Sequence, residues 1–320
     1  MKIDRDIPYS QTSNEDSPFH TLDIYYDLAR IGGRRKPVIV FIHGGSWFEK
    51  DKSFLEVSEE EAMWAWFVEQ GYVFAGLNFR LADLAYPPKT TVFDMVDDIA
   101  RGIKWLSVNG VRYGGKKNGF ILVGHSSGAH LAVLIATDER YLRKYHLSLA
   151  DIGGVIAMDG AHYDLPQMMK ILQSEDLGMP HQRGMYVKMA KILGRTAQEQ
   201  ARISPVAFLG EGSKNIAFLL LSARPQSQQM SAKFCLLLED IGIHVLHYHF
   251  ERCSHSDFIF RFRGMVSKYI LPFLGQIQQT TESTDLPQWN TIFPKANSQD
   301  KVIAKSKFKF EEWLVTRKKK

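Results

Sequence analysis

Short apolar runs, most of them rich in Val, Ile and Phe, recur along the first 250 residues and alternate with amphipathic segments. Seven runs have strand character, and most of them have the length and composition of strands that are buried on both faces of a sheet. These runs lie at about residues 22–28, 37–42, 72–78, 119–123, 153–158, 216–221 and 243–250. Because parallel strands need crossover connections, this alternation predicts an α/β fold with a mainly parallel central sheet flanked by helices.

The segments between the runs have apolar residues three or four positions apart, which is the spacing of one face of a helix. Two such sets are Val92, Met95, Val96, Ile99, Ile103 and Leu106, and Met230, Phe234, Leu237, Leu238 and Ile241. A longer, methionine-containing insertion covers about residues 163–210. We expect it to form a helical cap over a ligand site at the carboxyl ends of the strands. The alternative is ordinary core packing, in which methionine fills gaps.

The character of the chain changes after residue 275. Residues 276–284 are polar, and residues 295–320 contain nine Lys or Arg and three Asp or Glu. The tail therefore carries more than the whole net charge of +5, and the rest of the chain has no need of nucleic acid as a partner. We expect one domain over residues 1–275, followed by a polar linker and basic tail over 276–320. The tail is either solvated or docks a partner.

Cysteine content and hydropathy indicate the cellular compartment of the protein. Cys235 and Cys253 are too few for a disulfide framework, and the 45% hydrophobic content provides a large core without one. The first residues contain no apolar stretch after their charges, and no apolar run reaches the length of a membrane span. These features predict a cytoplasmic protein. They leave its oligomeric state open.

The run at 119–123 leads through Gly124-His125-Ser126-Ser127-Gly128 into an apolar helix. This is the strand–turn–helix context that a G-x-S-x-G nucleophile elbow requires. The glycines permit a tight turn that exposes the Ser126 hydroxyl, and the start of the helix favours developing negative charge. The pattern predicts Ser126 as a nucleophile and the Ser127 N–H as one donor to an oxyanion.

A second motif follows the run at 37–42, which ends in His43-Gly44-Gly45-Ser46-Trp47. An oxyanion needs two or more preorganised N–H donors, and glycine lets the backbone approach a substrate closely. We expect Gly44 and Gly45 to supply donors beside Ser127. Taken alone, the motif would read equally well as a flexible turn.

A serine nucleophile needs a base, and His255 follows the last apolar run at the entrance to a final helix. His244, His247 and His249 lie within that run, but no carboxylate or cysteine accompanies them at the spacing of metal ligands. We therefore expect His255 to be the base. We expect neither a metal site nor a cofactor.

The acid that should orient the histidine is harder to place. Residues 222–229, after the run at 216–221, contain no Asp or Glu. Asp159, at the end of the run at 153–158, is a possible acid, and its alternative role is to cap a turn. If Asp159 is not the acid, the site is a dyad or is degenerate.

Over about residues 20–273 the chain resembles the α/β-hydrolase superfamily. Within it, the chain is similar to the kynurenine formamidase (arylformamidase) and hormone-sensitive-lipase-like esterase branches. The resemblance is carried by Leu22-Asp23-Ile24-Tyr25, His43-Gly44-Gly45-Ser46-Trp47, Asn78-Phe79-Arg80-Leu81-Ala82, Gly124-His125-Ser126-Ser127-Gly128 and His255-Ser256-Asp257. It implies Ser126 as nucleophile and His255 as base. The chain departs from the pattern at Ala223, which occupies the position of the family's acid.

The resemblance also implies an activity on a small molecule. The first expectation is a formamidase that converts N-formylkynurenine to kynurenine and formate. A carboxylesterase of short-chain esters is the alternative within the same chemistry. A catalytically impaired small-molecule binding protein is the alternative of another class, and Ala223 is the residue that favours it.

Overall fold

The computed structural model describes residues 1–10, 18–32, 35–55, 58–174, 182–265, 267–280 and 301–302. The described strands are β1 (Lys2–Pro8), β2 (Thr21–Tyr26), β3 (Val38–Ile42), β4 (Val73–Leu77), β5 (Phe120–His125), β6 (Ile152–Met158), β7 (Ala217–Ser222), β8 (Val245–His249) and β9 (Lys301–Val302). They form one sheet in the order β1-β2-β4-β3-β5-β6-β7-β8-β9. All neighbours from β4 to β8 pair in parallel, whereas β1, β2 and β9 pair antiparallel. The predicted mainly parallel sheet is confirmed.

The described α-helices are α1 (Met63–Glu69), α2 (Val92–Asn109), α3 (Ser127–Thr137), α4 (Arg140–Arg143), α5 (Leu165–Ser174), α6 (Gln182–Leu193), α7 (Ala197–Ala201), α8 (Pro225–Asp240), α9 (Asp257–Phe260), α10 (Phe262–Met265) and α11 (Ser267–Thr280). They cover both faces of the sheet, because its strands are apolar on both faces. Val38, Val40 and Ile42 of β3 pack into a core that includes buried residues of α2, α3 and α8. Ile39 and Phe41 point the opposite way, into a core with α1 and α11.

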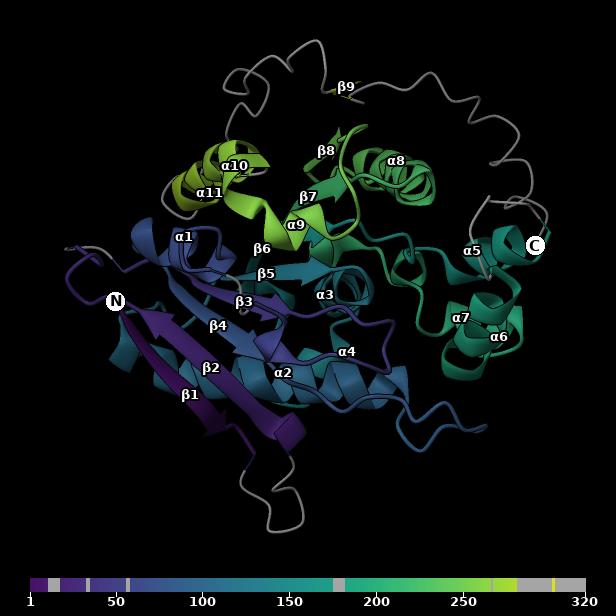
Figure 1. Cartoon of the computed structure of the whole chain (residues 1–320), viewed down its shortest axis with the longest axis horizontal. Coiled ribbons are helices and arrows are strands. Elements are labelled where there is room, and N and C mark those ends of the chain that lie inside the picture. Colours follow the sequence, from purple (N-terminus) through teal and green to yellow (C-terminus); the bar gives the residue numbers. More distant parts are fainter. Residues whose placement is uncertain are drawn as a thin grey trace.

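Helices α5, α6 and α7 belong to the segment 163–210. Figure 1 shows them grouped beyond the carboxyl ends of the parallel strands β3 and β5. One predicted boundary is wrong, because α11 continues through residues 276–280 instead of giving way to a linker after 275. Ile277 is buried against Gly154 of β6, and this packing extends the helix. The predicted tail falls on residues that, apart from 301–302, lie outside the described ranges.

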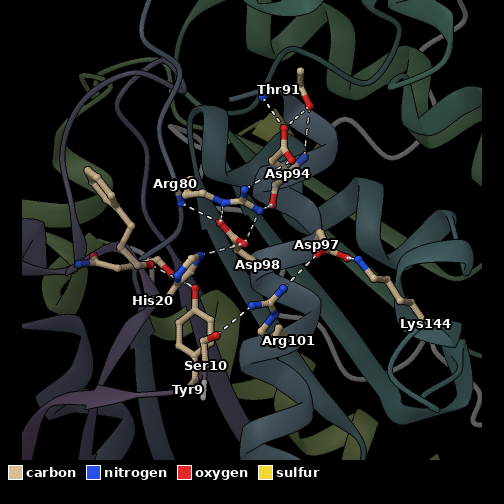
Figure 2. A network of polar contacts seen from close by, with 12 residues as sticks. Tyr9, Ser10, His20, Arg80, Thr91, Asp94, Asp97, Asp98, Arg101 and Lys144 are labelled. Carbon is tan, nitrogen blue, oxygen red and sulfur yellow. Dashed lines mark hydrogen bonds and ion pairs between the residues drawn. The ribbon is translucent and has the colours of Figure 1, made fainter. Parts of the chain in front are cut away.

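An ion network around a buried carboxylate joins the segment after β4 to α2. Asp98 of α2 is fully buried, and its carboxylate accepts from Arg80 Nε and Nη2, each at 2.8 Å. His20 Nε2 lies 3.2 Å from the same carboxylate. Figure 2 shows that Arg80 and His20 approach Asp98 from different segments. Burial raises the pKa of Asp98, but the hydrogen bonds from His20 and Arg80 outweigh burial and bring that pKa below its usual value.

Replacing Asp98 with Asn should destabilise the fold, because Arg80 would lose its buried counter-charge and His20 would lose the carboxylate that it contacts. We expect the free energy of unfolding at pH 7 to fall by about 3 kcal/mol, measured by urea denaturation. The lowered pKa of Asp98 means that its contribution is present above the unfolded-state pKa and is lost as the pH falls through the folded-state pKa. Asp98→Asn should therefore also weaken the loss of stability in acid.

The control is Arg143→Ala, which removes a largely exposed ion pair with Glu139. That change should cost less than about 1 kcal/mol. An Asp98→Asn protein as stable as the control would show that the network does not stabilise the fold.

Candidate active site

Ser126 lies at the sharp turn between β5 and α3. Its backbone has φ 57° and ψ −120°, a conformation that residues other than glycine rarely adopt. Its N–H donates to the Met158 carbonyl at 2.9 Å. A Cβ atom on Gly124 would lie 2.3 Å from the Gly128 carbonyl oxygen. A Cβ atom on Gly128 would lie 2.1 Å from the Ile42 carbonyl oxygen. Both glycines are therefore required by the close approach of β3, β5 and α3.

The loop after β3 lies beside Ser126. A Cβ atom on Gly44 would be 3.1 Å from the Ser126 Cβ, and Gly45 has φ +110°, where glycine is favoured. Ser127 is the first residue of α3, so its N–H has no acceptor within the helix. The structure thus brings Gly44 and Ser127 to the nucleophile candidate, with Gly45 next in the loop.

Contacts from α3 fix this loop in place. The Trp47 N–H donates to Ser127 Oγ at 3.3 Å, and Trp47 Nε1 donates to His130 Nδ1 at 3.2 Å. His130 Nε2 in turn donates to the Ile203 carbonyl at 2.8 Å. One buried histidine therefore links the loop after β3, the helix of the elbow and the segment that follows α7.

Asp159 meets His255 at the end of β6. His255 Nδ1 lies 2.5 Å from Asp159 Oδ2, and the Asp159 side chain is fully buried. Met158 of β6 pairs with Leu221 of β7, so Asp159 lies beside the loop that follows β7. The hydrogen bond joins the two residues named from the sequence as candidate base and possible acid.

The loop after β7 supplies donors to the same carboxylate. The N–H groups of Ala223 and Arg224 reach Asp159 Oδ1 at 2.8 and 3.2 Å, and Ser227 Oγ also donates to Oδ1. Arg224 Nε donates to Oδ2 at 2.6 Å. Burial raises the pKa of Asp159, but the His255 hydrogen bond and the Arg224 charge outweigh it and bring that pKa well below its usual value. Asp159 is therefore ionised at neutral pH.

His125, the residue before Ser126, anchors the His255 backbone. Because a carbonyl only accepts, the 2.8 Å contact is a bond from His125 Nε2–H to the His255 carbonyl oxygen. Burial lowers the pKa of His125 to about 3, so the ring is neutral. The sequence left the role of His125 open, and the structure gives it this contact.

Ser126 and His255 line one cavity of about 490 Å³. Its wall is mostly apolar and includes Trp47, Phe48, Met168, Met185, Met189 and Ile192. Its polar members include His162, Lys188, Arg224 and Gln226. The cavity is the size of a small-molecule site, and helices α5 and α6 contribute part of its wall. Within the described residues no hydrogen bond joins Ser126 to His255, which is common in such sites without substrate.

Sequence reasoning did not find the contribution of Arg224. The signal that could have found it is the adjacency of β6 and β7. The ends of neighbouring strands lie only about 5 Å apart, so a residue after β7 can reach an acid that follows β6.

His247 and His249, considered for a metal, instead bond Ser222 Oγ at 2.7 and 3.1 Å. No metal-binding group of three or more His, Cys, Asp or Glu occurs among the described residues. No helix within those same ranges is both long and apolar enough to cross a bilayer.

A protein-family model described as BD-FAE matches residues 22–218. Among curated proteins, the chain is 25% identical over 211 residues to a probable isoprenylcysteine alpha-carbonyl methylesterase of Oryza sativa subsp. japonica, covering 64% of the chain. It spans 45% of that relative's length. It is also 23% identical over 252 residues to the kynurenine formamidase of Danio rerio, covering 79% of the chain and 73% of the relative.

Solved structures give the same fold. Esterase B from Lactobacillus rhamnosis, in an inhibited form, superposes with a TM-score of 0.68 at 18% identity, covering 88% of each chain. A truncated carbohydrate esterase from gut microbiota superposes with a TM-score of 0.67 at 17% identity, covering 87% of this chain and 97% of that one.

Gly128→Ala should disturb the elbow, because the added methyl group would overlap the Ile42 carbonyl and push α3 away from β3. We expect a loss of about 2 kcal/mol or more in the free energy of unfolding, measured by urea denaturation. The matched control is Gly275→Ala in α11, where an added Cβ meets nothing within 4 Å. The control should be neutral or slightly stabilising. Equal stabilities for the two variants would contradict the packing argument.

Proposed function

We propose that this chain, which belongs to the BD-FAE family of the α/β-hydrolase superfamily, is a serine hydrolase that cleaves a small acyl or formyl group from an amide or an ester. The observation that carries the proposal is the hydrogen bond between His255 and the buried Asp159, beside a cavity that Ser126 also lines. Nucleophile, base and acid candidates thus converge from three strand ends.

The proposed reaction begins when the Ser126 hydroxyl attacks the substrate carbonyl and His255 Nε2 accepts its proton. Asp159 stabilises the imidazolium through Nδ1. The tetrahedral oxyanion accepts hydrogen bonds from the backbone N–H groups of Gly44, Gly45 and Ser127. His255 then protonates the leaving amine or alcohol. In the second half of the reaction, His255 accepts a proton from water as water attacks the acyl enzyme, and it returns that proton to Ser126 as the acid product leaves.

The position of Asp159 favours an enzyme over a binding protein. The binding-protein alternative rested on Ala223, which leaves the usual acid position empty. Because Asp159 reaches His255 from the neighbouring strand, the imidazole still has an ionised carboxylate partner. We propose Asp159 as the acid.

The substrate proposal follows from the cavity and the relatives. Trp47, Phe48 and the methionines give flat and adaptable apolar surfaces that suit an aryl group, so an arylformamide such as N-formylkynurenine is our first candidate. A short-chain carboxylic ester is the second, because esterases recur among the similar proteins. We also propose that α5, α6 and α7 form the cap of this pocket.

Hydrolysis of N-formylkynurenine and p-nitrophenyl acetate should be measured side by side with Ser126→Ala as the control. We expect the wild-type protein to cleave at least one substrate and Ser126→Ala to lose at least about 10⁴-fold in kcat. Formamide cleavage selects the first candidate, and ester cleavage alone selects the second. Hydrolysis that persists in Ser126→Ala would contradict the proposed nucleophile.

Asp159→Asn should lower kcat by about 10²- to 10⁴-fold, because the amide cannot stabilise the imidazolium. Asp138→Asn is a matched control, since Asp138 is also buried and bonds an arginine, Arg140, at 2.8 Å through Nε. The control should retain most activity in the same kinetic assay. Equal activities of the two variants would remove Asp159 from the mechanism.

A further inference from the structure

The loop after β7 binds a carboxylate instead of supplying one. Ala223, Arg224 and Ser227 all donate to Asp159 from this loop and the first turn of α8. Arg224 also donates from Nη2 to the Asp159 main-chain carbonyl at 2.7 Å, so a single guanidinium holds both the side chain and the backbone of that residue.

We propose that Arg224 is a positioning residue for the proposed hydrolysis. It fixes Asp159 against His255 and places a permanent positive charge beside the imidazole. This inference rests on the proposed function, because it assigns Arg224 a role in that same site.

The positioning role follows from the Asp159 backbone. Asp159 has φ 50°, in the left-handed region that non-glycine residues seldom occupy, so its conformation must be held by its surroundings. The planar guanidinium matches two acceptors with fixed geometry, which a lysine ammonium cannot do. Arg224 is one-third exposed and lines the cavity, so it acts at the edge of the site rather than deep in the core.

The electrostatic role follows from a shared oxygen. Arg224 Nε and His255 Nδ1 lie 2.6 and 2.5 Å from the same atom, Asp159 Oδ2. The guanidinium therefore satisfies part of the negative charge that would otherwise stabilise a protonated His255. A cation close to the imidazole also disfavours its protonation directly.

Of the charged groups around His255, Asp159 and Arg224 are the two that shift its pKa. His125 of β5 has its ring centroid 4.4 Å from that of His255, and burial keeps it neutral. His162, after β6, is buried with a pKa well below its usual value. Lys188 of α6 lines the cavity, and Asp257 of α9 accepts from the Ser254 N–H at 2.7 Å. The pKa of His255 lies below its usual value, first because of burial and then because Arg224 opposes the Asp159 hydrogen bond.

A base with a lowered pKa is neutral, and hence competent, at lower pH. Removing the Arg224 charge should raise the pKa of His255 and move the acid limb of kcat/KM to higher pH. The variants are Arg224→Gln, which removes the charge, and Arg224→Lys, which keeps the charge but loses the double contact.

We expect the acid limb for Arg224→Gln to move up by about 1 pH unit, measured with an ester whose hydrolysis is followed at a pH-independent wavelength. Arg224→Lys should leave the limb near its wild-type position while lowering kcat. Arg252→Gln is the control for charge alone, since Arg252 is exposed in the same loop as His255 and its charge is screened. Arg252→Gln should change neither the position of the acid limb nor kcat.

A loss of activity by Arg224→Gln that is equal at every pH would overturn the electrostatic part of the proposal. Full activity in Arg224→Lys would overturn the positioning part. The pKa of His255 should also be measured by NMR in histidine-labelled protein, with His255→Asn to assign the signal. A rise of that pKa in Arg224→Gln would support the Arg224 proposal even if no hydrolysis were found, and an unchanged pKa would overturn it whether or not hydrolysis is found.

Discussion

A fully buried carboxylate is stable only where enough donors surround it, and the donors around Asp159 define the candidate active site. They come from two segments that are distant in sequence. His255 follows β8, and Ala223, Arg224 and Ser227 lie between the end of β7 and the first turn of α8. Each donor fixes the loop that carries it. Satisfying one negative charge therefore brings together the ends of β6, β7 and β8 at the edge of the cavity.

The elbow contributes a second constraint to the same place. Ser126 holds its strained conformation because β3, β5 and α3 approach too closely for side chains at Gly124 and Gly128. The Ser126 N–H binds the end of β6, one residue before Asp159, and His125 binds the backbone of His255. The nucleophile candidate and the histidine–carboxylate pair are thus fixed relative to one another by main-chain contacts as well as by side chains.

Hydrophobic periodicity predicted the seven central strands and the parallel sheet, because buried strands carry their signal in their own residues. It did not predict β1, whose charged residues Lys2, Asp4, Arg5 and Asp6 suit an edge strand and mask its alternation. The motifs likewise indicated Ser126 and His255 as candidate nucleophile and base from local spacing. Arg224 has no such local signal, because its partner lies 65 residues away and is brought close only by the pairing of β6 with β7. Asp159 could be named only as a possible acid for the same reason.

We propose that Asp159 and His255 act as one unit in catalysis. A double-mutant cycle with Asp159→Asn, His255→Ala and the combined variant, followed by kcat/KM on the substrate that wild-type protein cleaves, tests it most directly. The combined variant should be no slower than His255→Ala alone, because the carboxylate has no further role once the imidazole is removed. Losses that multiply in the combined variant would contradict this coupling, and so would full activity in Asp159→Asn.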